Sequence, residues 1–221
     1  FALAAITHPD DKAFPSLDRP LVAQLTRSAV AEGLVSFDAQ GRVVPALADR
    51  WIVTDDGLSY IFRLRDGEWR GGAPLTAKSA KAALEAALAA QKGSALALDL
   101  AVLNEVRVMA GRVMEIRLSR PQPHFLQLLA QPELGLLHDG QGNGPMVMEQ
   151  RGKIARFIPI DPSTLGLSEV PDWDRRTRAL ELSALPAQQA VERFNEGAVD
   201  LVLGGHIEDY PFSSAVGILR G

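Results

Sequence analysis

The densest run of glycine in the chain is Gly-Gln-Gly-Asn-Gly-Pro at residues 140–145. Glycine-rich loops can bind phosphate, because their backbone N–H groups are free to cradle an anion. A dinucleotide-binding loop follows a strand and opens a helix. This run instead ends in Pro145 and continues into the strand-like residues Met146, Val147 and Met148. The sequence therefore predicts a tight connection into a core strand rather than a nucleotide site.

The four histidines are spread along the chain, at His8, His124, His138 and His206, and cysteine is absent. No two histidines have the His-x-His or His-x-x-x-His spacing that places two imidazoles on one metal ion. The sequence therefore predicts neither a local metal site nor a cofactor.

Two pairs of adjacent carboxylates, Asp10-Asp11 and Asp55-Asp56, raise the possibility of acid–base chemistry. Adjacent residues on a turn rarely converge on one substrate atom, and the Asp55-Asp56-Gly57 sequence is already explained by a turn. The chain also lacks the Gly-x-Ser-x-Gly elbow and the zincin and kinase motifs. We therefore predict that it is not an enzyme.

Polar residues follow two apolar runs that have the character of strands. Thr7 and His8 come after residues 2–6, and Gly204, Gly205 and His206 come after residues 200–203. If the two strands are parallel neighbours, these residues share one edge of the sheet, where open α/β sheets bind ligands. We predict that the five residues line a ligand cleft. Ordinary solvated loops are the alternative, and the sequence alone does not choose between the two.

Residues 31–77 carry the clearest structural pattern. Turn signals at residues 38–41, 55–57 and 71–74 separate short apolar runs, and glycine supplies the positive φ that tight turns need. After Gly57, apolar side chains alternate along the chain, so that one face of the sheet is buried. The pattern predicts a β-meander, followed by an alanine-rich helix that Thr76 caps. A further hairpin is expected around Gly111.

Composition limits the classes of protein to which the chain can belong. The chain has 221 residues, 47% of them hydrophobic, and a net charge of −4, which is ordinary for a globular protein and gives no indication of a nucleic-acid surface. No apolar run reaches the length of about 18–20 residues that a membrane span needs.

The order of residues in 31–77 also resembles the signature of the family 5 extracellular solute-binding proteins, the peptide, nickel and opine class that serves ABC importers. The matching residues are Glu32-Gly33-Leu34-Val35, Asp38, Gly41, Pro45-Ala46-Leu47-Ala48, Trp51, Asp56-Gly57, Tyr60, Phe62-Arg63-Leu64-Arg65, Gly67, Gly72, Pro74 and Thr76-Ala77. Gly142-Asn143-Gly144-Pro145 is similar to a further motif of the family, and residues 194–201 to another. The turn at Trp69-Arg70-Gly71-Gly72 departs from the family pattern, which has His-Asp in place of Arg-Gly.

The resemblance implies a mixed α/β fold: one lobe of a class II periplasmic-binding protein, with a mixed core sheet and an inserted subdomain of meander and helices. Residues 1–37 would begin the core sheet of this first lobe, 38–139 would form the insertion, and 140–221 would complete the sheet and end at the hinge to a second lobe. Full members of the family are about twice as long, so the chain resembles the first lobe alone or a fragment.

The same resemblance implies the function. We expect the chain to be part of the substrate-binding component of an ABC importer. Such a component captures a peptide or peptide-like solute by closing two lobes, of which this chain is the first, and then docks on the permease subunits. The motif at residues 142–145 would lie near the cleft between the lobes, which adds Asn143 and Gly144 to the predicted ligand residues. The periplasm is the expected location, with no nucleic-acid partner. The alternative is the sensing domain of a transcriptional regulator that reuses this fold.

Overall fold

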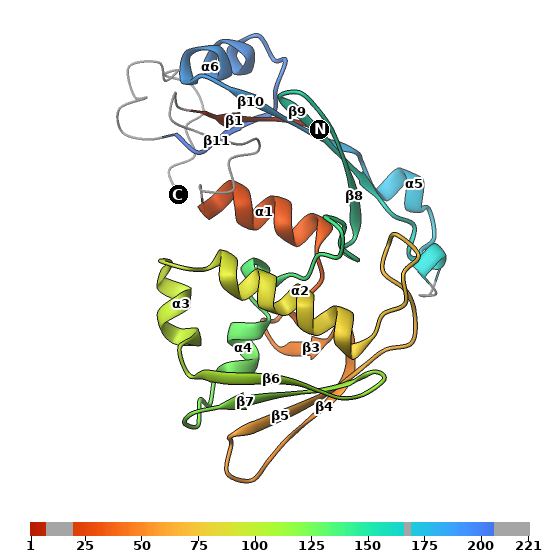
Figure 1. Cartoon of the computed structure of the whole chain (residues 1–221). Helices are drawn as coiled ribbons and strands as arrows, with labels where there is room; N and C mark the ends of the chain where they lie inside the picture. Colours follow the sequence, from red (N-terminus) through yellow and green to blue (C-terminus); the bar gives the residue numbers. More distant parts are fainter. Residues whose placement is uncertain (8–19, 166–168, 206–221) are drawn as a thin grey trace. The chain divides into compact units, whose positions relative to one another are not determined.

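The computed structural model describes residues 1–7, 20–165 and 169–205 (Figure 1). Contacts divide the chain into two compact units. Unit 1 is Phe1–Ala29 with Pro145–Gly221, and unit 2 is Val30–Gly144. The chain therefore enters unit 2 once, after Ala29, and leaves it once, after Gly144.

Unit 1 contains a five-stranded mixed sheet in the order β11-β1-β10-β9-β8. The strands are β1 (Ala2–Ile6), β8 (Met146–Arg151), β9 (Ile154–Pro159), β10 (Leu180–Leu185) and β11 (Leu201–Leu203). The strand β1 runs parallel to both of its neighbours, β10 and β11, whereas β9 pairs antiparallel with β10 and β8. Residues far apart in the sequence therefore meet on the three parallel strands.

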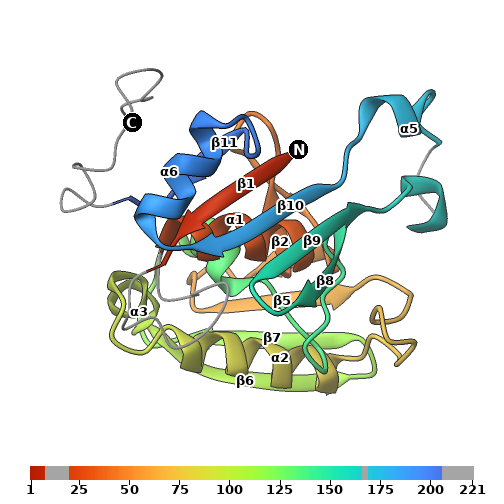
Figure 2. The same cartoon turned by 90° about the horizontal axis from the view of Figure 1, so that it is seen from above.

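Two helices cover opposite faces of this sheet (Figures 1 and 2). Because side chains alternate along a strand, Ala4 and Ile6 of β1 face α6 (Ala187–Asn195), where Ala190 is fully buried. Leu3 points to the other face, toward α1 (Pro20–Val30). An apolar cavity of about 150 Å³ remains between α1 and the sheet, and its lining includes Ala29. The α1 side of this core is therefore less completely filled.

Unit 2 is built on antiparallel strands. Its larger sheet has the order β4-β5-β7-β6, and β2 and β3 form a separate pair. The strands are β2 (Val35–Phe37), β3 (Val43–Pro45), β4 (Ala48–Val53), β5 (Ser59–Leu64), β6 (Leu103–Ala110) and β7 (Val113–Leu118). The predicted turns and the second hairpin are confirmed, but the single meander is wrong: residues 31–77 form two hairpins, β2-β3 and β4-β5, that belong to different sheets.

The core of unit 2 lies between the larger sheet and its helices. These are α2 (Ala77–Ala90), α3 (Ala95–Leu100), α4 (Phe125–Leu129) and the 3₁₀ turn η1 (Pro132–Leu134). Phe62 of β5 and Phe125 of α4 are fully buried there. The helix α2 begins with a capping box, in which the Thr76 hydroxyl accepts from the Ser79 N–H and the Ser79 hydroxyl accepts from the Thr76 N–H. The predicted cap is thus confirmed.

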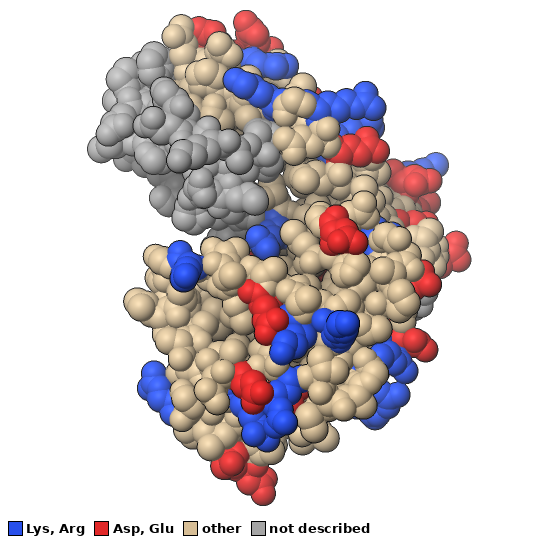
Figure 3. All heavy atoms as spheres, viewed as in Figure 1, with Lys and Arg blue, Asp and Glu red and all other residues tan. Residues whose placement is uncertain are grey.

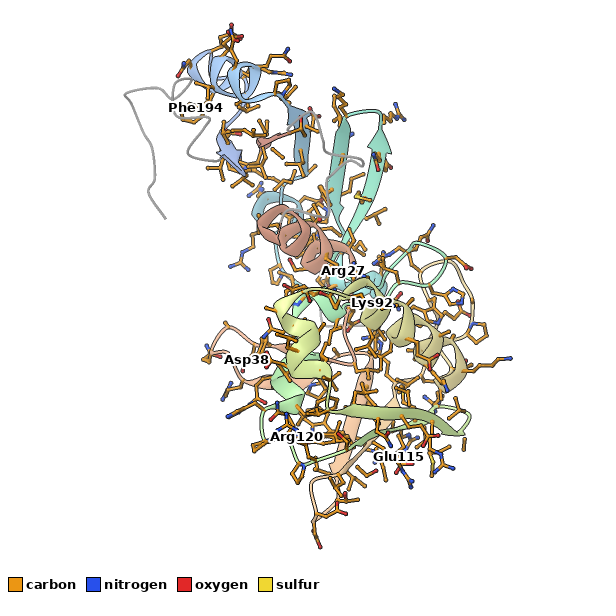
Figure 4. All side chains as sticks on the ribbon, turned by 60° about the vertical axis from the view of Figure 1, so that its left-hand side comes forward. Arg27, Asp38, Lys92, Glu115, Arg120 and Phe194 are labelled. Atoms are coloured by element: carbon orange, nitrogen blue, oxygen red, sulfur yellow. The ribbon has the colours of Figure 1, made fainter. Side chains whose placement is uncertain are left out.

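The outer face of the larger sheet holds a buried carboxylate, Glu115 on β7, which Figure 4 labels. It accepts hydrogen bonds from the Ser59 hydroxyl and from Arg117 Nε, the latter at 3.0 Å, and Arg107 lies 3.9 Å away. These contacts, led by the Ser59 hydrogen bond, lower the pKa of Glu115. The carboxylate therefore stays charged on a face that otherwise meets solvent.

Two short helical segments lie between β9 and β10. These are the 3₁₀ helix η2 (Pro162–Leu165) and α5 (Trp173–Arg176). Asp172 adopts a positive φ of 57° immediately before α5, and asparagine and aspartate tolerate this conformation better than most residues. Within the part of the chain that the structure describes, no helix is both long enough and apolar enough to cross a bilayer.

Candidate functional site

The first candidate site is the edge of the sheet in unit 1 where the three parallel strands end. The strands β1 and β11 pair through Leu3↔Leu201, Ala4↔Val202 and Ala5↔Leu203. Their carboxyl ends therefore share one edge, together with the end of β10. The predicted arrangement of these strands as parallel neighbours is confirmed, and the sheet edge is of the kind at which α/β proteins bind ligands.

Three of the predicted ligand residues lie at this edge. Thr7 continues the ladder of β1, because its N–H donates to the Leu185 carbonyl at 2.8 Å. Its half-buried hydroxyl makes no hydrogen bond within the described part of the chain. Gly204 has a φ of 77°, which turns the chain out of β11 toward the exposed Gly205. His8 and His206 lie outside the described residues.

The opposite end of β1 is fixed by a residue that the sequence reasoning did not single out. The Asp200 carboxylate accepts from the Ala2 N–H at 2.7 Å, and the Asp200 N–H donates to the Ala2 carbonyl at 2.7 Å. This side-chain and main-chain pairing sets the register of β11 against β1. The sequence signals for it are the position of Asp200 directly before an apolar strand and its place in residues 194–201, which resemble a family motif.

The second candidate site is the glycine-rich segment 142–144 in unit 2. A Cβ atom on Gly142 would lie 2.4 Å from the Val30 carbonyl oxygen, and one on Gly144 would lie 2.4 Å from the Val30 carbonyl carbon. The Gly144 N–H also donates to the Val30 carbonyl at 3.0 Å. Both glycines are therefore required by close backbone approach, which confirms the tight connection, but the strand that follows, β8, is a largely exposed edge strand and not the predicted core strand.

Arg70 holds this segment from the other side. Its Nε donates to the Gly142 carbonyl and its Nη2 to the Gly144 carbonyl, both at 2.6 Å. Between them, Asn143 Oδ1 accepts from the Arg70 N–H at 3.0 Å, and Asn143 Nδ2 donates to the Glu68 carbonyl at 2.8 Å. One sequence signal marks Arg70, namely its departure from the family pattern at this turn, but nothing in the sequence indicates these partners.

A charged pair lies in the same unit. Both oxygens of Glu32 accept from Arg65, each at 2.7 Å, in the bidentate geometry that suits guanidinium and carboxylate. Burial raises the pKa of Glu32, and the Arg65 hydrogen bonds oppose that shift. Burial also lowers the pKa of Arg70, while the charge of Glu32 acts to raise it. Arg70 therefore carries its charge in a partly desolvated place, with Glu32 as the compensating anion.

Trp69, next to Arg70, is also fixed. Its indole N–H donates to the Ser79 hydroxyl at 2.9 Å, and its ring stacks on His138 with centroids 5.3 Å apart. The side chain is 1% exposed. His138 thus packs against an aromatic ring, which suits a structural role.

The described residues of the two candidate sites present hydrogen-bonding groups. Among residues 1–7, 20–165 and 169–205, no group of three or more His, Asp and Glu side chains is placed to hold a metal ion. On the molecular face drawn in Figure 3, lysines and arginines are interspersed with aspartates and glutamates. Exposed main chain at a sheet edge and one hydroxyl can bind a polar solute without covalent chemistry.

Comparison with known proteins identifies the family. The middle region of the bacterial extracellular solute-binding proteins, family 5, matches residues 42–166, which is more than half of the chain. The chain belongs to this family.

Curated relatives match shorter stretches. The Escherichia coli K12 protein described as a probable deoxycholate-binding periplasmic protein, YgiS, is 36% identical over 121 residues, which are 47% of this chain and 23% of that protein. The glutathione-binding protein GsiB of Salmonella typhi is 26% identical over 140 residues, which are 63% of this chain and 26% of that protein. The chain thus matches about a quarter of each of these family members.

Solved structures of greater divergence share the fold. The binding protein AgaA from A. tumefaciens R10, solved with agropinic acid, superimposes with a TM-score of 0.68 at 18% identity, covering 91% of this chain and 43% of that one. Listeria monocytogenes OppA bound to peptide gives 0.63 at 17% identity, covering 90% and 45%. The predicted fold is confirmed: a mixed α/β lobe of the class II periplasmic-binding-protein type.

Proposed function

We propose that this protein is the substrate-binding component of an ABC importer and captures a peptide or peptide-like solute. The observation that carries the proposal is the family match over residues 42–166. Relatives described as glutathione-binding and peptide-binding support the solute class. The relative described as deoxycholate-binding makes an amphipathic acid the second solute to test.

In the proposed mechanism the solute binds at the sheet edge of unit 1, where Thr7, Gly204 and Gly205 lie. The exposed main chain of Gly205 would bond the amides of a peptide whatever its side chains, and the Thr7 hydroxyl would add one directed hydrogen bond. His8 and His206, which follow these residues, and Asn143 and Gly144 in unit 2 stay predicted members of the binding region.

In this proposal, transport depends on closure of two lobes over the solute. The chain would supply the first of two lobes, which close over the solute by a hinge motion. The closed form would then dock on the permease subunits from the periplasmic side. The alternative of a regulator's sensing domain is not favoured, because the relatives named above are binding proteins.

The proposal is tested by ligand-dependent thermal stabilisation. The product of the complete gene is heated with glutathione, trialanine or deoxycholate, and unfolding is followed by fluorescence. A bound solute at a hundred times its Kd stabilises the folded state by about 2.7 kcal/mol, enough to raise Tm by roughly 5–10 °C. If none of these solutes, nor a wider panel of peptides, opines, sugars and metal ions, shifts Tm, the proposed function is wrong.

The predicted sheet-edge site has its own test. Thr7→Val removes the hydroxyl with little change of shape, and loss of one hydrogen bond to the solute should weaken binding about five- to tenfold. Thr164→Val is the matched control, because Thr164 is exposed and its hydroxyl donates only to the nearby Asp161 carbonyl. Equal affinities for the two variants in calorimetry would remove Thr7 from the site.

A further inference from the structure

Four hydrogen bonds join residues 142–144 to residues 68–70, and each uses a group that a solute would otherwise have to engage. The carbonyls of Gly142 and Gly144 accept from Arg70, and the two ends of the Asn143 amide bond to the main chain of Glu68 and Arg70. The Gly144 N–H is occupied by Val30. A solute that contacted the Asn143 side chain directly would have to replace these bonds or share their acceptors.

We propose that Arg70 and Asn143 form a clamp that holds residues 142–144 in one conformation before any solute is present. Both are then positioning residues: they act on the predicted binding region through the shape of this segment and not by contact with solute. The effect on solute affinity rests on the proposed function, whereas the clamp itself does not.

The clamp lies at the points where the chain enters and leaves unit 2. The chain enters unit 2 at Val30 and leaves it after Gly144. These two points are hydrogen-bonded to each other at 3.0 Å, and Gly142 and Gly144 pack against the backbone of Val30 and Ala31 with no room for a side chain. The clamp therefore fixes, within unit 2, both places where the chain passes between the units.

The chemistry of Arg70 suits this task. A guanidinium is planar and presents several N–H groups in a fixed fork, so one side chain can hold two carbonyls two residues apart. The ammonium of lysine is a single point charge on a flexible stem and cannot reproduce both bonds in that geometry. The carboxylate of Glu32 supplies the counter-charge that lets a cation remain in this partly desolvated place.

The first test needs no solute. Amide hydrogen exchange is measured by NMR for Arg70→Lys, Asn143→Ala, the double variant and the control Arg63→Lys, whose parent side chain makes no hydrogen bond or ion pair within the described part of the chain. Exchange at the Gly144 and Arg70 amides should rise about tenfold more than at the amide of Phe62 in the core, because the opening is local. Exchange that rises equally at all three amides would overturn the clamp.

The double variant tests whether the two residues act as one unit. If they do, Arg70→Lys with Asn143→Ala should raise exchange at the Gly144 amide little more than either change alone. Fully multiplied effects would show independent roles and contradict the proposal. Arg63→Lys should leave exchange at all three amides unchanged.

The second test separates positioning from contact. Affinity is measured by calorimetry for whichever of glutathione, trialanine and deoxycholate stabilises the parent most. A clamp predicts that Arg70→Lys and Asn143→Ala weaken binding by a similar factor, about tenfold, and that the double variant is no weaker than either. Weakening by Asn143→Ala alone would assign Asn143 to direct contact and overturn the positioning role. A parent that binds none of the solutes would count against the proposed function and leave the exchange result standing.

Discussion

The close packing of residues 142–144 makes a quantitative prediction about two small substitutions. Gly142→Ala and Gly144→Ala each add one methyl group without demanding an unusual φ, because neither glycine has a positive φ. Each new Cβ would lie 2.4 Å from an atom of the Val30 carbonyl group, where ordinary contacts are 3.4–4 Å. The backbone must therefore move by about 1 Å.

The magnitude follows from what that movement disturbs. Overpacking a tight site costs about 1–3 kcal/mol, and loss of the hydrogen bond from Gly144 to Val30 adds about 1 kcal/mol. We expect each variant to lose about 3 kcal/mol of unfolding free energy. With a denaturant slope of about 1.5 kcal/mol/M, the urea midpoint of unit 2 falls by about 2 M.

The assay can be confined to unit 2. The chain has three tryptophans, and Trp51 and Trp69 lie in unit 2. In a Trp173→Phe background, urea titration followed by fluorescence therefore reports on that unit alone. Gly71→Ala is the matched control, because a Cβ there meets nothing within 4 Å and φ is not positive, so stability should stay within about 0.5–1 kcal/mol of the parent. Equal midpoints for Gly142→Ala, Gly144→Ala and Gly71→Ala would refute the packing argument.

Three further changes probe other parts of the fold. Thr76→Ala removes the cap of α2 and should lower the unfolding free energy by about 1 kcal/mol in the same titration, whereas no loss would show that the capping box is dispensable. Because the pKa of Glu115 is lower in the folded state than its ordinary value of 4.5, its contribution to stability is complete above about pH 5 and is lost as pH falls through the folded value. Glu115→Gln should therefore lower the unfolding free energy by about 1–3 kcal/mol at pH 7, and the unfolding free energy of this variant should depend less on pH below pH 5. Glu105→Gln, at an exposed position, is the control. If Glu115→Gln loses stability below pH 5 as steeply as the parent does, this reasoning is wrong. Ala29→Leu adds side-chain volume at the apolar cavity of unit 1 and should raise the unfolding free energy by about 1 kcal/mol, seen as a higher Tm. A lower Tm would show that the cavity is too narrow for the added atoms.

The sequence was most informative where local chemistry decides the structure. The two hairpins in residues 31–77 are marked by turn residues, and the alternation after Gly57 predicts the buried face that Tyr60, Phe62 and Leu64 form, although the sequence pattern did not show that the hairpins belong to different sheets. Turn conformation and side-chain alternation are properties of neighbouring residues, so a single sequence carries them. The capping box at Thr76 is of the same kind.

Features set by distant residues were less accessible. The sequence could suggest that β1 and β11 are parallel neighbours, but not that β10 lies on the other side of β1, because strand order depends on packing across the whole sheet. The bonds from Arg70 to Gly142 and Gly144 join residues more than 70 positions apart. Nothing in the local pattern of an arginine beside two glycines specifies such partners.

The structure also changes what the Gly142-Asn143-Gly144-Pro145 motif indicates. The phosphate-loop interpretation and the ligand-contact interpretation both assume that glycine frees backbone groups for a bound molecule. Here the two glycines bring backbone against backbone, and the Gly142 carbonyl and both main-chain groups of Gly144 are already bonded inside unit 2. A chain could therefore require this motif for folding whatever solute it carries. Matching the motif then identifies the fold, and the choice of solute has to come from other residues, such as Thr7 at the sheet edge, whose hydroxyl makes no hydrogen bond to the described residues.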